Sequence, residues 1–261
     1  MKQSEAKKIV TNYYLEILNR NPDNFGLNHY IDLLVQNKIN SSQLELLFRN
    51  SKEYLIKFPQ TMPNLIYLND EDEIPNLNII AMYRIKNVER WIKKSLESTS
   101  KICGKIVILD DGSTDNTLKI CKTFSSVVDI HEQKNLVFDE TRDNNMLLQM
   151  ALKHNPDYLL FLDGDHIIMP GMEKILYEDL IYLHPNSDVF EFQVLDMSEQ
   201  PNRYRINNPT TNYIYKQLFK VDNQKNLHFL PTKYPYNMHC SKIPDNFNKK
   251  NNISLSRMKI L

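Results

Sequence analysis

The sequence predicts an α/β domain, a mostly parallel β-sheet flanked by helices, preceded by a small all-helical domain. Residues 1–60 carry apolar side chains at helical spacing and show no strand pattern. From Leu77 onward, short apolar runs alternate with amphipathic segments. That alternation is typical of parallel strands joined by right-handed helical crossovers. Two of the apolar runs end in paired acidic residues, which places polar chemistry at the carboxyl ends of strands.

Length and composition agree with a globular protein of this kind. The chain has 261 residues, of which 41% are hydrophobic and 25% are charged, and its formal net charge is zero. A neutral chain gives no electrostatic reason to expect a nucleic acid or an anionic membrane as partner. The three cysteines lack metal-ligand spacing, no signal segment follows Met1, and no apolar run reaches the roughly 20 residues of a membrane span. We therefore expect a cytoplasmic protein with reduced thiols.

The change of pattern sets the expected domain boundaries. We expect a small helical domain over residues 1–62, a proline-framed acidic linker over 63–76, the α/β domain over 77–245 and a polar tail over 246–261. Within the α/β domain, the expected helices begin near Asn87, Leu118, Arg142 and Pro170. The expected strands are 78–82, 105–109, 127–130, 158–162, 189–194 and 213–221.

The second strand ends in Asp110-Asp111-Gly112-Ser113-Thr114-Asp115. Gly112 permits a tight turn, and Ser113 or Asp115 can cap the helix that follows. Capping does not account for two adjacent acids at the strand end. Carboxylates suit hydrogen bonds to a ring N–H and to ribose hydroxyls, whereas phosphate needs N–H groups and cations. The turn therefore predicts a pocket for a nucleoside.

The fourth strand runs from Tyr158 into Asp163-Gly164-Asp165. Two carboxylates this close suit a hard cation such as Mg²⁺ or Mn²⁺ that also binds phosphate oxygens. Gly164 allows another group to approach the backbone closely. Taken alone, two acids around one residue are a common loop feature, but here they follow a buried strand and accompany a second acidic strand end.

Together these segments resemble the GT-A fold glycosyltransferases of family 2. The resemblance rests on residues 78–92, on Val107–Thr117, on Tyr158–Asp165 and on Met169-Pro170-Gly171, and it covers roughly 77–240. It implies a hexosyltransferase-like enzyme that moves a sugar from a nucleotide-diphosphate donor, most often a UDP-sugar, to a hydroxyl of a glycan, lipid-linked or protein acceptor, usually with inversion.

The resemblance also implies roles for individual residues. Asp110 and Asp111 would bind the nucleoside, and Asp163 and Asp165 would hold Mn²⁺ or Mg²⁺ against the donor diphosphate. Arg84, at the end of the first strand, and Arg142, at the start of the helix before the fourth strand, would face the donor. Both arginines could equally be surface cations.

The general base and a third metal ligand are less well defined by the sequence. Inverting transfer needs a base to deprotonate the acceptor hydroxyl. Glu191, Asp188 and Asp196 all follow the Asp163 segment; we favour Glu191 because burial in an apolar strand would raise its pKa. It could also be a glutamate on the exposed face of an edge strand. His239 is the candidate third ligand, with His228 a weaker one, and His166 could orient the acids.

The N-terminal segment resembles a small helical domain family of unknown function. The shared pattern is Leu-x-Arg-x-Pro-Asp-x-x-Gly-Leu from Leu18 to Leu27, with Ser-x-Glu-Tyr at Ser51–Tyr54. It implies a fold and no activity. The domain could be an accessory packing module, or it could dock an acceptor or a partner enzyme.

Three alternatives to a transferase remain open from the sequence. A phosphatase with an aspartyl nucleophile also places Asp-x-Asp after a buried strand, but it rarely has the acidic turn upstream. A sugar nucleotidyltransferase needs a glycine-rich loop after the first strand, which Met82–Lys86 lacks. A non-catalytic protein that binds nucleotide-sugars, with an incomplete acceptor site, is consistent with the short segment after the sixth strand.

Overall fold

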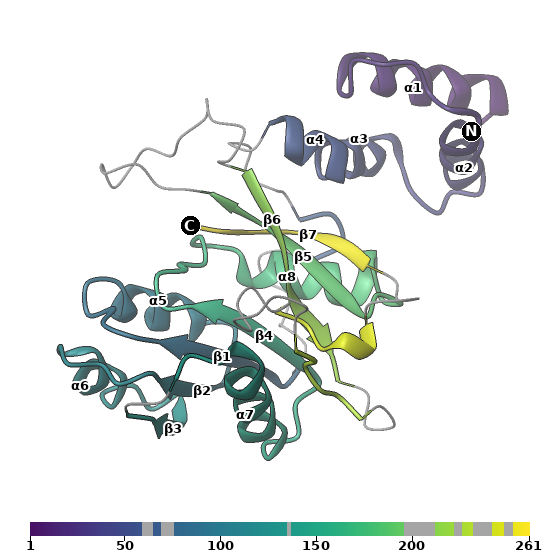
Figure 1. The fold of residues 1–261 in the computed structure, drawn as a ribbon. Coiled ribbons are helices and arrows are strands. Elements are labelled where there is room, and N and C mark those ends of the chain that lie inside the picture. The colour runs from purple at the N-terminus through teal and green to yellow at the C-terminus, as the bar shows by residue number, and fades with distance from the viewer. Residues whose placement is uncertain are drawn as a thin grey trace. The chain divides into compact units, whose positions relative to one another are not determined.

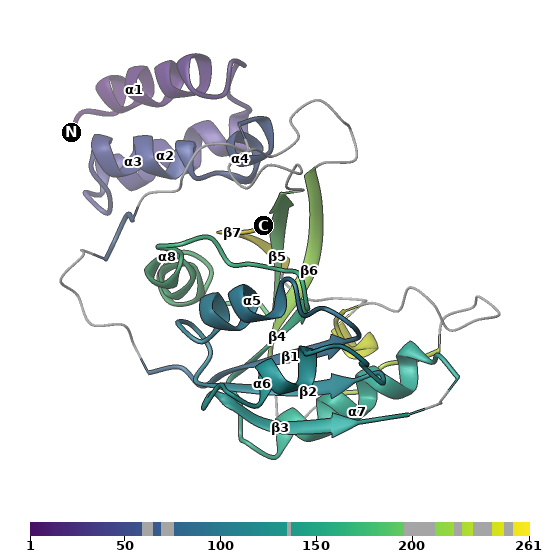
Figure 2. The ribbon, with the colours of Figure 1, turned by 90° about the vertical axis from the view of Figure 1, so that its left-hand side faces the viewer.

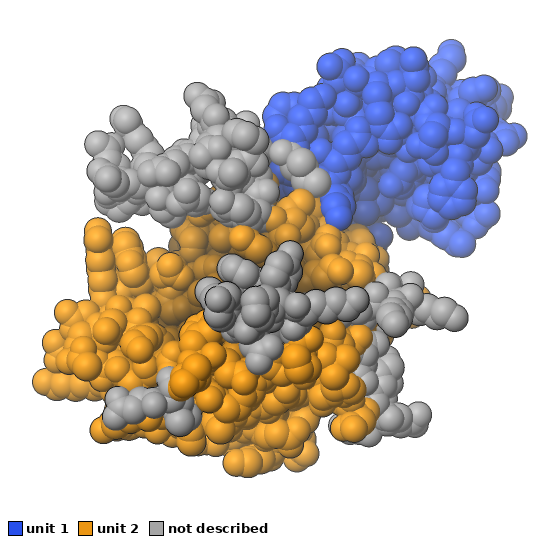
Figure 3. All heavy atoms as spheres, in the orientation of Figure 1, with its two compact units in different colours: residues 1–72 blue, residues 73–261 orange. Residues whose placement is uncertain are grey.

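The computed structural model describes residues 1–58, 65–68, 76–134, 137–195, 212–221, 226–231, 242–247 and 253–261 (Figure 1). The chain divides into two compact units, Met1–Asp72 and Glu73–Leu261, which Figure 3 distinguishes by colour. In the described residues, no helix has both the length and the apolar character needed to cross a bilayer.

The first unit is all-helical, as the sequence predicts. Its buried core is formed by apolar residues at helical spacing, including Val10, Tyr14, Leu34 and Phe48. Asn40 and Gln43 form a capping box at the start of the third helix, which satisfies backbone N–H groups there. The helices are α1 (Gln3–Glu16), α2 (Asn24–Val35), α3 (Ser41–Arg49) and α4 (Lys52–Lys57).

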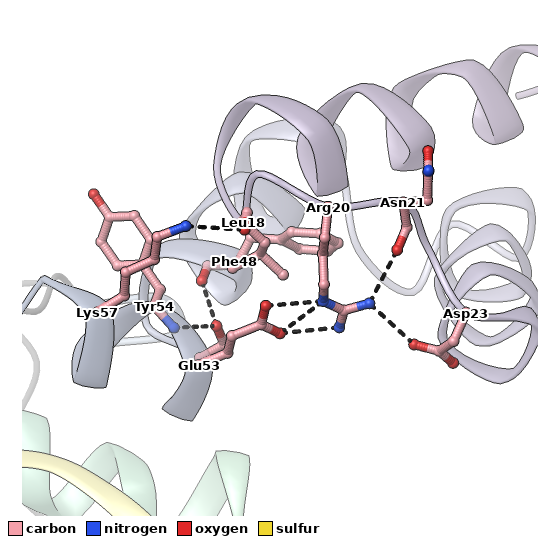
Figure 4. Close-up of polar contacts among 9 residues, drawn as sticks. Leu18, Arg20, Asn21, Asp23, Phe48, Glu53, Tyr54 and Lys57 are labelled. Atoms are coloured by element: carbon pink, nitrogen blue, oxygen red, sulfur yellow. Dashed lines mark hydrogen bonds and ion pairs between the residues drawn. The ribbon is translucent and has the colours of Figure 1, made fainter.

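The residues of the N-terminal motif hold these helices together (Figure 4). Arg20 pairs with Glu53 at 2.8 Å, which ties the segment after α1 to α4. Asp23 accepts a hydrogen bond from the Gly26 N–H at 2.7 Å and so caps α2. A Cβ on Gly26 would lie 2.0 Å from the Tyr14 hydroxyl, so any larger residue would force the Tyr14 ring to move. The motif is thus explained by packing and capping within this unit.

The second unit is built on a seven-stranded sheet in the order β3-β2-β1-β4-β6-β5-β7. Strands β3, β2, β1 and β4 are parallel, β6 is antiparallel to both β4 and β5, and β7 is parallel to β5. The mostly parallel α/β class predicted from the sequence is confirmed. The strands are β1 (Ile79–Ile85), β2 (Lys105–Asp110), β3 (Val127–Glu132), β4 (Tyr158–Asp163), β5 (Val189–Leu195), β6 (Asn212–Lys220) and β7 (Ile253–Ile260).

Helices cover both faces of the parallel half of this sheet (Figure 2). Leu147 and Leu148 of α7 (Glu140–Leu152) pack with Met82 and Phe161 in one buried cluster. On the other face, the buried Tyr83 hydroxyl lies 2.7 Å from the Thr99 hydroxyl of α5 (Ile92–Thr99). Burial on both faces explains why β1, β2 and β4 are nearly continuous apolar runs.

The structure corrects two details of the sequence analysis. Residues Ile253–Ile260, assigned there to a polar tail, form β7 within the sheet, and Met258 and Ile260 are fully buried. The helix expected from Asn87 begins at Ile92, and Asn87 itself lies in the preceding loop with a positive φ of 51°. The remaining helical segments are α6 (Thr117–Cys121), α8 (Glu173–Glu178), the π-helical η1 (Asp179–Leu183) and the short η2 (Asp245–Phe247).

Candidate functional site

The carboxyl ends of three neighbouring parallel strands bring the two acidic segments together. In the sheet register, Arg84 of β1 pairs with Asp163 of β4, and Ile85 of β1 pairs with Asp110 of β2. β1 therefore lies between the acidic turn and the Asp163 segment. This is the edge of an open α/β sheet where ligands bind.

A pocket of about 380 Å³ lies at this edge. Both charge signs line it: three cations and three acids face a space that also has two aromatic rings. A mixed lining of this kind suits a ligand that has both a polar ring and anionic groups. The lining residues are Arg84, Ile85, Lys86, Asp111, Phe138, Glu140, Asn144, Phe161, Asp163 and Lys242.

The two acids of the turn after β2 have different surroundings. Asp110 is 1% exposed, and its Oδ2 accepts a hydrogen bond from the Ser113 N–H at 2.9 Å, so it fixes the turn. Its Oδ1 is buried without a hydrogen-bond partner in the described part of the chain. Asp111 faces the pocket and accepts a hydrogen bond from Gln133 Nε2 at 3.0 Å. Gly112, with a φ of +76°, makes the turn possible.

The turn is tied to the segment after β1 rather than to α6 alone. Ser113 Oγ accepts a hydrogen bond from the Asn87 N–H at 2.9 Å, and Asn87 Oδ1 accepts one from the Thr114 N–H at 2.8 Å. Asp115 accepts from the Thr117 N–H at 2.9 Å, within the first turn of α6. Of the two residues expected to cap this helix, Asp115 bonds to its first N–H, whereas the Ser113 hydroxyl accepts from Asn87 instead.

Arg84 lies in a cluster of charges that the sequence analysis did not identify. Its Nη2 is 3.1 Å from Asp111 Oδ2 and 3.1 Å from Oδ2 of Asp143, which is fully buried. The guanidinium also lies 4.2 Å from the centre of the Phe138 ring. Because the carboxylates of Asp111 and Asp143 already compensate its charge, Arg84 positions Asp111 and offers no free charge to a phosphate. Asp143 and Phe138 had no recognisable motif; only their place near the start of α7 linked them to the site.

Arg142 does not line the pocket. Its Nε donates to Asp143 Oδ1 at 2.8 Å, and its side chain is 34% exposed. Together with Arg84, it holds the buried Asp143 carboxylate between two guanidinium groups. Arg142 thus contributes to the support of the site from α7.

Asp163 is the half-exposed end of β4, and a lysine contacts it. Lys242, 79 residues further along the chain, donates to Asp163 Oδ2, and His166 Nε2 lies 3.4 Å from the same oxygen. Burial would raise the pKa of Asp163, but the charges of Lys242 and His166 outweigh it and hold the pKa below its ordinary value. The carboxylate is therefore ionised at neutral pH. Lys242 could not be foreseen, because no pattern links it to β4.

Gly164 is required by close packing, as its position between two acids predicted. A Cβ at this residue would lie 2.9 Å from Val88 Cγ2 and 3.1 Å from Ile85 Cγ2. Ser95 Oγ of α5 donates to the His166 carbonyl at 2.5 Å, which fixes the turn after Gly164. The neighbouring Asp165 is exposed.

We expect Gly164→Ala to lower the free energy of unfolding by about 1–3 kcal/mol, because the added methyl overpacks the contact with Val88. Urea denaturation measures this. Gly104→Ala is the matched control, since nothing lies within 4 Å of a Cβ there, and it should change stability by less than about 0.5 kcal/mol. Equal effects of the two substitutions would contradict this account of Gly164.

The acids at the end of β4 fit part of a metal site. In the described ranges, no three His, Cys, Asp or Glu side chains converge as a metal would require. Yet Asp163 Oδ2 already holds a cationic group, the Lys242 ammonium, and Asp165, two residues on, is exposed although it is not among the residues that line the pocket. One or two carboxylates, completed by phosphate and water oxygens, are a usual Mg²⁺ site. The donor set therefore fits a divalent cation that arrives with a phosphate ligand.

The other predicted residues lie away from this pocket or outside the described residues. Glu191 is on β5, between β6 and β7, so it is not on an edge strand, and it does not line the pocket. His228 Nδ1 lies 2.8 Å from the Asn226 carbonyl oxygen. Asp196 and His239 are among the residues that the structure does not describe.

Comparison with known proteins shows to which family this part of the chain belongs. Residues 79–243 match the family described as glycosyl transferase family 2. The chain belongs to glycosyl transferase family 2. The family 2 match extends from the first residue of β1 to just beyond Lys242, so it includes all the residues that line the pocket. Residues 2–58 match a domain of unknown function (DUF4214), in agreement with the resemblance of the N-terminal motif.

Individual relatives of the family 2 domain are distant. The glycosyltransferase GlyA of Streptococcus pneumoniae is 28% identical over 130 residues, covering 46% of this chain and 18% of that protein. The cholesterol galactosyltransferase of Borreliella burgdorferi is 27% identical over 95 residues, covering 35% and 25%. The chain thus spans a quarter or less of these relatives. A crystal structure of S. aureus TarS 1–349 in complex with UDP has a TM-score of 0.39 at 22% identity, covering 49% of this chain and 37% of that one.

Proposed function

We propose that the family 2 domain binds a nucleotide-sugar and transfers the sugar with inversion to an acceptor hydroxyl. The donor that we propose is a UDP-sugar. One observation carries the proposal: Asp111 and Asp163, from the ends of two different strands, line a single pocket together with Lys86 and Lys242. A nucleoside diphosphate has a polar ring system and an anionic end, and this pocket has a partner for each. The acceptor would be a glycan, a lipid-linked group or a protein.

The nucleoside half of the proposed site is the turn after β2. Asp111 would accept hydrogen bonds from a ring N–H or from ribose hydroxyls, while Asp110 holds the turn in shape through Ser113. Arg84 fixes the orientation of Asp111. The Phe138 ring, 43% exposed at the pocket, offers an apolar surface to the base.

The diphosphate half of the proposed site is the end of β4. Asp163 and Asp165 would hold Mg²⁺ or Mn²⁺, which acts as a Lewis acid and offsets charge on the departing nucleotide diphosphate. Lys86 and Lys242 bring further positive charge to the same pocket. His239 is kept as the proposed third ligand.

Deprotonation of the acceptor hydroxyl is assigned to an acid that follows β4, Asp196 or Glu191. Glu191 lies on an interior strand outside the donor pocket, which is compatible with a base that faces the acceptor. A base acts on the acceptor and not on the donor, so its replacement by the amide should abolish transfer and leave the affinity for UDP unchanged.

Calorimetric titration of the full chain with UDP, GDP and dTDP, each with Mn²⁺ and with EDTA, tests the proposal. We expect UDP to bind at least tenfold more tightly with Mn²⁺ than with EDTA, a difference of about 1.4 kcal/mol. Absence of binding by all three nucleotides would contradict the proposal. Hydrolysis of p-nitrophenyl phosphate by the chain would indicate a phosphatase instead.

A further inference from the structure

We propose that Lys242 is the counter-ion of Asp163 when the donor site holds no ligand. Its ammonium then pairs with the Asp163 carboxylate. When a divalent metal and the donor diphosphate bind together, the ammonium moves from the carboxylate to the diphosphate. This inference rests on the donor site proposed above. It predicts that metal and nucleotide bind cooperatively. The metal frees Lys242 to bind the diphosphate, and the diphosphate gives the displaced ammonium a new partner.

Three side chains from two strands, β4 and β6, set the position of the Lys242 ammonium. It donates to Asp163 Oδ2 at the end of β4, and it lies 5.9 Å from the ring centre of Phe161 and 5.8 Å from that of Tyr215 on β6. Its side chain is 23% exposed, whereas the Asp163 side chain is 47% exposed. A lysine between two aromatic faces and a carboxylate is stabilised there by charge pairing and by cation–π attraction.

At the Asp163 carboxylate this ammonium and a divalent cation compete for the same negative charge. Charges of the same sign within a few ångströms of each other repel, and repulsion is stronger in a partly buried site than in water. On this proposal a metal that binds Asp163 competes with Lys242 and drives its ammonium off the carboxylate. Without a new anionic partner for the displaced ammonium, that displacement weakens metal binding.

A donor diphosphate would supply that partner inside the same pocket. Arg84 is already compensated by Asp111 and by the buried Asp143, each 3.1 Å away. Lys242 is on a flexible four-carbon stem and lines the pocket, so its ammonium can move from the carboxylate to a phosphate without a change of backbone. Asp163 would then pair with the metal and Lys242 with the diphosphate, and these two pairs replace the broken Lys242–Asp163 pair.

Mn²⁺ binding by the full chain without nucleotide, followed through the electron paramagnetic resonance signal of free Mn²⁺, tests the competition. We expect Lys242→Gln to bind Mn²⁺ at least fivefold more tightly than the wild type. Lys242→Arg keeps the charge and should behave as the wild type. Lys122→Gln removes a lysine charge outside the pocket, where Lys122 pairs with Glu132 at 2.7 Å, and it should change the Mn²⁺ affinity less than twofold.

Titration with UDP in EDTA tests the transfer to the diphosphate. Here Lys242→Gln should bind UDP at least fivefold more weakly than the wild type, because it lacks the charge that serves in place of the metal. An unchanged or weaker Mn²⁺ affinity in Lys242→Gln would overturn the role of Lys242 while leaving the donor site intact. Failure of the wild type to bind UDP in either buffer would overturn the donor site itself.

Discussion

The Asp163→Asn, Asp165→Asn double variant is expected to bind UDP with the same affinity in Mn²⁺ and in EDTA. Amides keep the size of the carboxylates but not the charge that a hard cation needs. We therefore expect the whole metal-dependent gain, at least tenfold in affinity, to disappear. Calorimetry of the variant beside the wild type measures this directly.

A control must remove two carboxylates without touching the pocket. Glu97 and Glu132 pair with lysines on the surface, at 3.8 Å and 2.7 Å. The Glu97→Gln, Glu132→Gln variant should keep the metal dependence of the wild type. If the Asp163, Asp165 variant also kept it, the metal would bind elsewhere.

Replacing Asp143 by asparagine is expected to lower the free energy of unfolding by about 3 kcal/mol. Asp143 is fully buried and receives both Arg84 and Arg142. Removing one partner from a buried charge cluster leaves the others without compensation, which costs more than the intact pair contributes. The single tryptophan of the chain, Trp91, lies in the same unit as Asp143, Glu73–Leu261. Its fluorescence in urea therefore reports the unfolding of that unit.

Asp129→Asn is the matched control for Asp143. Asp129 lies 3.9 Å from Lys153 in an exposed pair, which contributes little to stability. We expect a change below about 0.5 kcal/mol. A loss of stability in Asp143→Asn no larger than in this control would show that solvent compensates the two arginines.

Strands β1, β2 and β4 could be predicted because burial on both faces demands continuous apolar runs. The residues at their ends could be predicted because parallel strands finish at one edge of the sheet, which brings Asp110 and Asp163 to either side of the end of β1. Local sequence was sufficient for these features, since each is contained in one strand and the turn after it.

Features that depend on contacts between distant segments could not be predicted. β7 interrupts its apolar residues with Ser256 and Lys259, both of which are buried. Its pairing with β5 also includes a register shift, so a simple alternation is absent. Lys242 reaches Asp163 across 79 residues, and its role depends only on how the chain returns to the sheet.

The N-terminal motif illustrates the opposite case, in which a recognisable pattern has a structural explanation. Arg20, Asp23 and Gly26 each make a contact that fixes one helix of the first unit to another or caps it. The pattern therefore accounts for a fold, and it assigns no chemistry to that unit.

The proposed donor site has a nucleoside half after β2 and a diphosphate half at the end of β4. Its most direct test is a crystal structure of the full chain with UDP and Mn²⁺, with the metal located by its anomalous scattering. We predict an anomalous peak bonded to the carboxylates of Asp163 and Asp165, the uridine against Asp111, and the Lys242 ammonium on the diphosphate. An anomalous peak remote from both carboxylates, or UDP bound outside this pocket, would contradict the account.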